Sequence, residues 1–500
     1  MNNLLFVPLL IPLATATAGL LAWRRRNLQR MLGVCGTTSL LVAGLCLLTQ
    51  VRGKGILSVQ AGNWPAPFGI TLVADSFSAL MIAATGFMGL AVSVYSLTDA
   101  DAGQESLGYH PLLQVLLLGV CGSFLTADLF NLYVWFEVLM ISSFVLLALG
   151  GRREQIEGAI KYVALNLTAS AFFLAGIGLL YGVTGTLNMA HVAVQLRETE
   201  HTGTVPIIAA LLFSAFGVKA AVFPFHFWLP ASYHTAPIAV TTLFSALLSK
   251  VGIYVLIRIF TLIFVQEAIA GQAIILTAAG LTMLIGVLGA MVQYEMRRLL
   301  SFHIVSQIGY LLMGLGLMTP LALAGTIFFM AHIIAAKSAL FLTTGIVARL
   351  TGSSELPRSG GLYHQRPFLA AIFLLPALSM AGLPPLSGFW AKLALITASL
   401  GHGHYLLTLV ALLVSLMTLF SMTKIWNEAF WKTRPPGEET DPRPMPVLSS
   451  VQLYAPALAL ALVSVTMGLG AEPFFRLALV AAGQLLEPAG YITAVLGVRP

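Results

Sequence analysis

Charged residues are scarce in this chain. Only 9% of its 500 residues are Asp, Glu, Lys or Arg, whereas hydrophobic residues make up 58% and the mean hydropathy is +0.91. A soluble domain carries about 25% charged residues, and a soluble chain this apolar would expose large sticky patches. The scarcity therefore excludes an ordinary soluble protein. It predicts a surface that faces lipid, where each crossing helix needs about 20 apolar residues.

Cysteine is almost as scarce. The three cysteines, Cys35, Cys46 and Cys121, lie within apolar stretches and form no C-x-x-C pair. This pattern argues against a disulfide framework, a zinc site or an iron–sulfur cluster, and we expect the three side chains to be buried. Phosphate-loop, G-x-S-x-G and H-E-x-x-H motifs are also missing, so nothing supports chemistry on a substrate. The net charge of +7 forms no basic stripe on a soluble face, which argues against a nucleic-acid partner.

Long apolar windows dominate what is present, and they predict an all-α polytopic membrane protein of about fourteen transmembrane helices. Residues 473–498 are again apolar but are interrupted by Arg476, Glu487 and Pro488. They could form a surface helix, a partner contact or a further hydrophobic segment. The expected spans are 3–22, 29–49, 70–97, 109–127, 129–150, 156–184, 205–224, 237–264, 272–292, 298–317, 321–350, 368–400, 404–431 and 452–472.

The distribution of positive charge predicts the orientation. Positive charge follows the first apolar run, as Arg24-Arg25-Arg26, so we interpret that run as a retained helix with its N-terminus outside. Of the 26 Lys and Arg residues, fifteen then fall in loops expected in the cytoplasm, six on the other side and five within spans. Arg258, near a helix end, is expected to reach outward to water. The longest polar stretch, residues 432–450, is expected to be a cytoplasmic loop.

Two segments combine prolines with a buried lysine. One runs from Lys219 through Pro224 to Pro230, and the other runs from Gly382 through Pro384-Pro385 to Lys392. Proline removes a backbone donor and breaks a helix, and broken backbone within a membrane is tolerated only inside protein or beside water. Two such breaks in corresponding places are typical of an inverted-repeat transporter.

These breaks predict a division of the chain into four parts. Peripheral helices 1–3 occupy residues 1–108, and two inverted five-helix repeats, each with one broken helix, occupy 109–264 and 265–431. A cytoplasmic loop, helix 14 and a C-terminal segment occupy 432–500.

Five ionisable residues lie at bilayer depth and are candidates for function. Glu137 lies eight residues after Leu129, roughly 12 Å into its helix. Lys219 has no carboxylate within a helical turn, so we expect Glu137 to be its partner; the alternative is an ion pair that only fixes packing. Lys250, Lys337 and Lys392 complete the set, which suits a chain of groups that take up and release protons.

Histidines and boundary residues form a second group of candidates. His332 titrates near neutral pH and suits a relay, and His303 is an even choice between relay and packing. His226 follows Pro224 and could simply cap backbone. Lys161 could equally reach outward to water, and boundary acids such as Asp75 and Asp128 often cap helices.

In this order the motifs resemble a known family, the antiporter-like subunits shared by respiratory complex I and the multisubunit Mrp cation/proton antiporters. The resemblance covers nearly the whole chain, and within the family the chain is most similar to the Mrp branch. It is carried by Phe136-Glu137, Lys219 to Pro237, Ser249-Lys250-Val-Gly, Ala381 to Phe389 with Lys392, Ser301 to Tyr310 and Lys424 to Trp431.

The resemblance implies roles for these residues. Glu137 and Lys219 would be the paired charges of the first half, Lys250 the central bridge, His332 and Lys337 second-half relay positions, and Lys392 the terminal group. It implies a proton-translocating subunit of a Na⁺/H⁺ antiporter in a prokaryotic cell membrane rather than an enzyme. The partners would be the other Mrp subunits (A, B, C, E, F and G), with no cofactor. Two alternatives stay open: a pump subunit of a quinone- or hydrogenase-linked complex, and a passive membrane scaffold.

Overall fold

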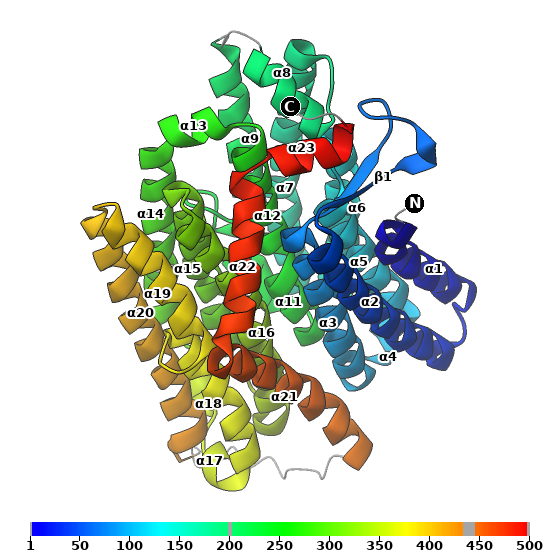
Figure 1. The fold of residues 1–500 in the computed structure, drawn as a ribbon. Coiled ribbons are helices and arrows are strands. Elements are labelled where there is room, and N and C mark those ends of the chain that lie inside the picture. The colour runs from blue at the N-terminus through cyan, green and yellow to red at the C-terminus, as the bar shows by residue number, and fades with distance from the viewer. Residues whose placement is uncertain (1–2, 199–202, 434–445, 498–500) are drawn as a thin grey trace.

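The computed structural model is a bundle of helices with one small β-hairpin at its edge (Figure 1), and it describes residues 3–198, 203–433 and 446–497. The strands are β1 (Leu57–Gln60) and β2 (Thr71–Ala74), with short 3-10 turns at Asn3–Phe6, Ala61–Asn63, Tyr233–Thr235 and Leu356–Arg358 and π-helical turns at Phe244–Leu248 and Trp426–Trp431. The α-helices are α1 (Val7–Leu21), α2 (Arg26–Lys54), α3 (Ser76–Asp99), α4 (Ala102–Ser106), α5 (Tyr109–Leu125), α6 (Leu129–Ala148), α7 (Arg153–Thr184), α8 (Met189–Glu198), α9 (Thr204–Ala220), α10 (Trp228–Ser232), α11 (Ile238–Leu243), α12 (Ser249–Leu262), α13 (Val265–Ala270), α14 (Gln272–Met291), α15 (Met296–Leu317), α16 (Pro320–Thr351), α17 (Leu362–Gln365), α18 (Pro367–Ala381), α19 (Ser387–Gly401), α20 (Tyr405–Ile425), α21 (Val447–Leu469), α22 (Ala471–Leu486) and α23 (Ala489–Leu496).

Helix length and hydropathy confirm a polytopic membrane protein. Among the described residues, eleven helices are long and apolar enough to cross a bilayer, or twelve if α22 and α23, bent by 72°, count as one span. Three shorter apolar helices, α5, α9 and α18, match the remaining expected spans. The count of fourteen crossings stays a prediction. The span expected at 70–97 begins too early, because Thr71–Ala74 pairs with β1 and the helix starts at Ser76.

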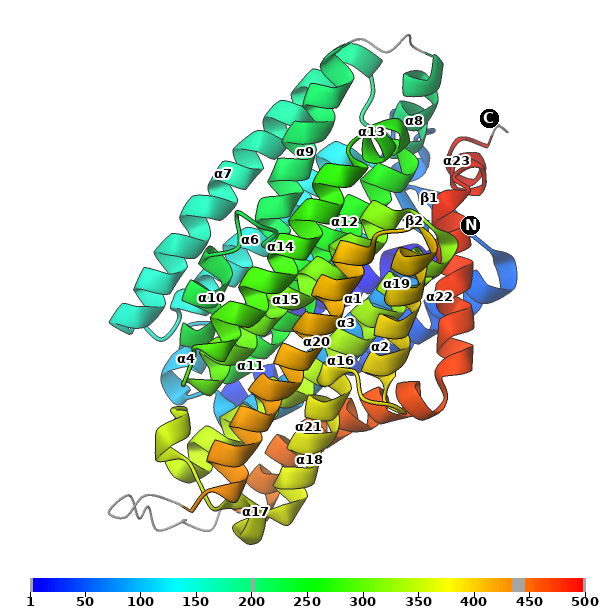
Figure 2. The same cartoon turned by 90° about the vertical axis from the view of Figure 1, so that its left-hand side faces the viewer.

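The bundle has two distinct ends (Figures 1 and 2). The hairpin, α8, α13, α23 and both chain ends lie at one end, which we call the hairpin end. Helices α4 and α17 lie at the opposite end. Most of the polar stretch expected to be a loop, residues 434–445, lies outside the described residues.

Both predicted helix breaks are confirmed. Helix α9 ends at Ala220, and Ala221 adopts a left-handed conformation (φ +63°) before the chain resumes at α10. Helix α18 ends at Ala381, and Gly382 is left-handed (φ +89°) before α19 begins at Ser387. In each case the amide of the residue after the left-handed one donates a hydrogen bond to a carbonyl in the last turn of the helix. The Val222 amide donates to the Gly217 carbonyl at 2.8 Å, and the Leu383 amide donates to the Leu378 carbonyl at 3.2 Å. This is the Schellman motif that ends many helices. Superposition of the two halves stays a prediction.

The C-terminal segment crosses the bundle in two pieces. Helix α21 begins at the end opposite the hairpin, where Gln452 accepts a hydrogen bond from Thr98 at 2.6 Å. The chain turns at Gly470, and α22 continues to the hairpin end, where Gln484 accepts from the Ser76 amide at 2.9 Å. Helix α23 then lies across β1 and α8 (Figure 1). The segment 473–498 is thus mostly a helix beside the bundle, followed by a short one across its end.

The cysteine prediction is wrong at two of three positions. Cys121 is buried in α5, but Cys35 and Cys46 are exposed on α2. Helix α2 is peripheral and presents one face outward, so apolar sequence there indicates contact with lipid and not with the protein core.

A buried ion pair joins the hairpin to the middle of the chain. Asp75 and Arg258 are 1% and 6% exposed, and Arg258 Nη2 lies 2.5 Å from Asp75 Oδ2. The other carboxylate oxygen of Asp75 accepts from the Ser78 amide at 2.8 Å and caps α3. Arg258 also donates to the Tyr254 hydroxyl at 3.2 Å. The expectation that Arg258 reaches outward is therefore wrong, because a partner acid from another segment holds it inside.

This pair generates a stability prediction. Asp75→Asn keeps the helix cap but leaves the buried Arg258 cation unpaired, so we expect a loss of about 3–5 kcal/mol in the free energy of unfolding. The double change Asp75→Asn with Arg258→Met removes both charges and should recover most of that loss. Thermal unfolding of the detergent-solubilised protein measures both, and a single variant as stable as wild type would contradict a structural role for the pair.

Candidate functional site

A serine bridges the two charged residues of the first half. Ser170 on α7 donates to Glu137 Oε1 on α6 at 2.5 Å, and Lys219 on α9 donates its Nζ proton to Ser170 Oγ at 3.2 Å. The Lys219 ammonium also lies 4.9 Å from the centre of the Phe136 ring. The expected partners are thus brought together, but through a hydroxyl and not through a direct ion pair. Ser170 was missed because a serine in an apolar helix carries no signal of its own in the sequence.

Lys250 lies in the centre of the bundle and follows a π-helical turn. It is fully buried, and its Nζ donates to the Ser245 carbonyl of that turn at 2.5 Å. Helix α12 packs closely on α9 at Gly252, where a Cβ atom would lie 2.9 Å from the Ala220 amide nitrogen. A larger residue cannot fit there, so this glycine lets the helix of Lys250 touch the helix of Lys219. π-turns inside α-helices are frequent at functional sites.

Lys337 and His303 begin the second half of the chain of polar groups. Lys337 on α16 is fully buried, and its Nζ lies 3.4 Å from the Leu300 carbonyl. Lys337 is close enough to Lys250, and His303 on α15 is close enough to Lys337 and Lys392, for their charges to interact. Both ring nitrogens of His303 are buried and have no protein partner among the described residues. The two residues are therefore within electrostatic reach of both the central lysine and the lysine at the second helix break.

His332 meets the second helix break through a cluster of serines. Its Nδ1 lies 2.8 Å from Ser387 Oγ, and Ser387 lies 3.1 Å from both Ser379 and Ser464. Gly388 allows this approach, because a Cβ atom there would lie 1.8 Å from the Ser379 carbonyl oxygen and 3.0 Å from His332 Nε2. The sequence singled out His332 but not these hydroxyls, since they come from three different helices.

Lys392 caps the broken helix α18. Its Nζ donates to the Met380 and Ala381 carbonyls at 2.9 and 3.1 Å and to Ser415 Oγ on α20 at 2.7 Å. The end of a helix leaves carbonyl groups without intrahelical partners and carries partial negative charge. The break therefore supplies the acceptors that a buried ammonium needs.

Several further polar atoms are buried along this path without a protein partner among the described residues. Buried polar groups are almost always hydrogen-bonded, to water where protein offers nothing. These positions are therefore candidates for ordered water. They are Ser245 Oγ, Ser249 Oγ, Ser338 Oγ, Gln307 Oε1, Thr326 Oγ1 and His332 Nε2.

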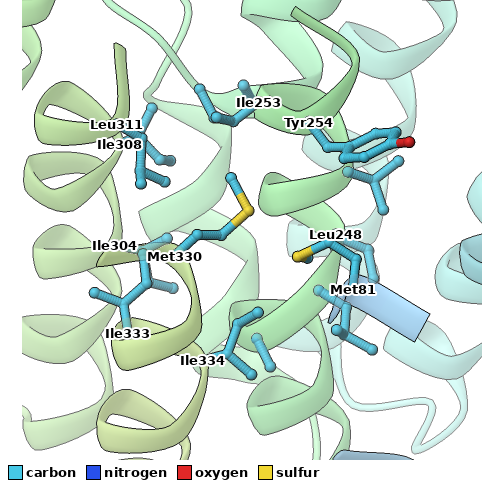
Figure 3. Close-up of a cluster of buried hydrophobic side chains, with 14 of the residues drawn as sticks. Met81, Leu248, Ile253, Tyr254, Ile304, Ile308, Leu311, Met330, Ile333 and Ile334 are labelled. Carbon is cyan, nitrogen blue, oxygen red and sulfur yellow. The ribbon is translucent and has the colours of Figure 1, made fainter. Parts of the chain in front are cut away.

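An apolar layer packs between these helices (Figure 3). It joins Met81 of α3, Leu248 of the π-helical turn and Ile253 of α12 to side chains of α15 and α16. Because these side chains neither donate nor accept hydrogen bonds, they offer no route for a proton. The layer from α15 and α16 consists of Ile304, Ile308, Leu311, Met330, Ile333 and Ile334.

The weaker candidates lie away from this path. Asp75 and Asp128 cap α3 and α6, with Asp128 Oδ1 accepting from the Asn131 amide at 2.7 Å. Lys161 is half exposed and pairs with Glu157 at 2.6 Å on α7. His226 stacks on Phe223 within the first break, and its buried Nδ1 has no hydrogen-bond partner, backbone or otherwise, in the part of the chain that the structure describes. No group of three or more His, Cys, Asp or Glu side chains that could hold a metal occurs in the described part of the chain.

Comparison with known proteins identifies the family. Residues 126–418 match the model described as "NADH:quinone oxidoreductase/Mrp antiporter, TM". The chain is 42% identical over 496 residues to the D subunit of the Na(+)/H(+) antiporter of Alkalihalophilus pseudofirmus and 38% identical to that of Bacillus subtilis, covering 99% of this chain and 100% of each relative.

Solved structures agree with this assignment. One chain of the Mrp complex from Dietzia sp. DQ12-45-1b aligns with a TM-score of 0.92 at 33% identity, over 99% of this chain and all of that one. A chain of the membrane-bound sulfane sulfur reductase, an archaeal respiratory membrane complex, aligns with a TM-score of 0.88 at 25% identity, with the same coverage. The chain is 38–42% identical to two antiporter D subunits over their full length, and it matches the family model and the fold. These findings show that the chain belongs to the family of Mrp antiporter D subunits.

Proposed function

We propose that this chain conducts protons within a multisubunit Na⁺/H⁺ antiporter, along the line from Glu137 through Lys219, Lys250 and Lys337 to Lys392. The observation that carries the proposal is the buried lysine series itself. All four lysines are at most 5% exposed, and each is held by a hydroxyl or a backbone carbonyl. Such costly groups inside a membrane protein mark ion and proton pathways. The chain is a transporter subunit and not an enzyme.

The proposal extends to the setting of the chain. Its partners are the other Mrp subunits (A, B, C, E, F and G), and the complex lies in a prokaryotic cell membrane. We place the hairpin end outside the cell. Arg24, Arg25 and Arg26 lie at the turn from α1 into α2, and the first turns of α2 pair with α4 at the opposite end through Arg30 and Glu105. Positive loops favour the cytoplasm.

In this mechanism Glu137 acts as the switch. At about 4 Å and an effective dielectric near 20, a carboxylate stabilises an ammonium by about 4 kcal/mol; the serine-bridged arrangement gives less, because the charges are farther apart. When Glu137 approaches, Lys219 keeps its proton. When it withdraws, the proton moves toward Lys250 through the contact of α9 with α12.

The likeness to the sulfane sulfur reductase chain supports a second candidate, a pump subunit driven by redox chemistry in a partner. The composition of the purified complex decides between them, since a redox pump must contain a subunit with an electron-transfer centre. Transport that responds to the variants below excludes the third candidate, a passive scaffold.

The first test removes the switch. Glu137→Gln keeps the shape of the side chain but removes its charge, so we expect loss of cation/proton exchange in membrane vesicles while the complex still assembles. Glu355→Gln, an exposed acid paired with Arg358, is the matched control. Exchange at the wild-type rate and pH profile in Glu137→Gln vesicles would show that this charge is structural.

The second test concerns the bridge. Ser170→Ala removes hydrogen bonds to two charged groups. Because the loss of even one such bond costs about 1.5–3 kcal/mol, we expect exchange to slow by at least about tenfold. Ser170→Thr retains the hydroxyl and should keep most of the activity. Stopped-flow measurement of proton exchange in vesicles compares the two, and equal rates for alanine and threonine would rule out the bridge.

The third test concerns the centre of the path. Lys250→Ala removes the central ammonium of the lysine series, and we expect exchange to fall by about 100-fold or more, as for the loss of a positioned proton-transfer group. Lys432→Ala, a surface lysine paired with Glu428, is the control. Native gels check that both complexes assemble. Normal transport by an assembled Lys250→Ala complex would refute the relay.

A further inference from the structure

Helix α22 carries an ion pair on its outward face. Glu472 and Arg476 are four residues apart and pair with each other, yet their side chains are 73% and 76% exposed. Val480 and Gly483 continue the same stripe of the helix, and Val480 is 54% exposed. We call these four residues the α22 face. It is defined by the exposure of this pair on a helix that is otherwise largely apolar.

The depth of this pair is fixed by contacts at both sides. At its start, Gly468 packs on the second helix break, where Trp390 donates to the Gly468 carbonyl at 3.0 Å. At its end, Gln484 binds the Ser76 amide at the start of α3. Glu472 lies twelve residues before Gln484, about 18 Å along the helix. In a hydrocarbon layer about 30 Å thick, Glu472 is therefore near the middle.

Lipid does not suit this face. A charged side chain in hydrocarbon is costly, and charged residues within membrane spans almost always face protein or a water-filled cavity. A long arginine can reach outward to the headgroups, but a glutamate has too short a stem to do so from the middle of the bilayer. The internal pair reduces the cost, but the other hydrogen-bonding groups of both side chains have no partner among the described residues.

Hollows lie on both sides of the helix. One, of about 660 Å³, is lined by Leu321, Trp390 and Leu393 from α16 and α19. The other, of about 740 Å³, has a more polar lining that includes Arg52 at the end of α2, Ser76 at the start of α3 and Gln484 of α22. Glu472 and Pro473 line both. Figure 1 shows α22 as a ridge on the front of the bundle, with α19 on one side and α2 and α3 on the other.

We propose that the α22 face is the docking site for a membrane-spanning helix of a partner subunit, one that carries polar or charged side chains at mid-membrane depth. Glu472 and Arg476 would bind those side chains, the hollow beside α16 and α19 would receive apolar ones, and Gly483 would allow close approach of the two backbones. The charges of the α22 face favour a polar partner, because a purely apolar helix would offer Glu472 and Arg476 no more hydrogen bonds than lipid does.

Swapping the two charged residues of the α22 face tests whether a partner subunit binds to them. Glu472→Arg combined with Arg476→Glu keeps the pair within α22 but inverts what a neighbour meets. Because a hydrogen bond between membrane helices contributes about 1–2 kcal/mol, we expect about tenfold less assembled complex on native gels at equal expression. Exchange of the exposed pair Glu157 and Lys161 at the end of α7 is the matched control. Equal assembly of both exchanges would overturn the proposal.

A crosslinking experiment identifies the occupant. A photo-reactive amino acid at Val480 in the intact complex should give an adduct with another subunit, found by mass spectrometry. An adduct with a second copy of this chain, or with lipid alone, would also overturn the proposal.

Discussion

The cost of placing charge in a medium without water governs this structure. An isolated ion in such a medium is penalised by several kcal/mol, and the interior holds four lysines in a series that begins beside one carboxylate, Glu137. Three of the lysines are met by backbone carbonyl groups, and the fourth by a serine hydroxyl and an aromatic face. Dipoles therefore take the place that counter-ions have at a protein surface. A proton moving along such a series meets groups of similar character at each step, because each ammonium is held by neutral acceptors.

The second helix break follows from the same constraint. An unbroken helix keeps its carbonyl groups for its own hydrogen bonds, so it offers little to a buried ammonium. Ending α18 at Ala381 releases carbonyls toward Lys392, and the restart at Ser387 brings a hydroxyl to His332. The π-turn before Lys250 does the same on a smaller scale, since the Ser245 carbonyl accepts from the lysine. Each of these irregularities in the backbone is thus found beside a charge that needs it.

The sequence predicted the parts of this arrangement that stand out from an apolar background. Glu137 and the lysines are recognisable because a charge within a long apolar run is costly and is seldom kept without a function, and the two breaks are recognisable from Pro224 and from Pro384 with Pro385. What it did not predict depends on contacts between distant segments. Ser170 is 33 residues from Glu137, and Ser464 is 77 from Ser387. Arg258 was placed at a water boundary because it lies near the end of its expected span, and nothing in the sequence pairs it with Asp75, 183 residues away. Hydropathy also does not separate lipid-facing from core-facing positions, which is why two of the cysteines were misplaced.

The π-helical turn at Phe244–Leu248 has a geometric consequence for Lys250. Such a turn holds one residue more than the α-helical turn that it replaces. Each residue turns an α-helix by about 100°, so everything after the insertion points about 100° away from where an uninterrupted helix continuing from α11 would aim it. The direction in which Lys250 points is therefore set by the one extra residue of the π-helical turn. A chain with one residue fewer in this turn would keep its hydropathy and its span length, yet its lysine would face a different set of neighbours.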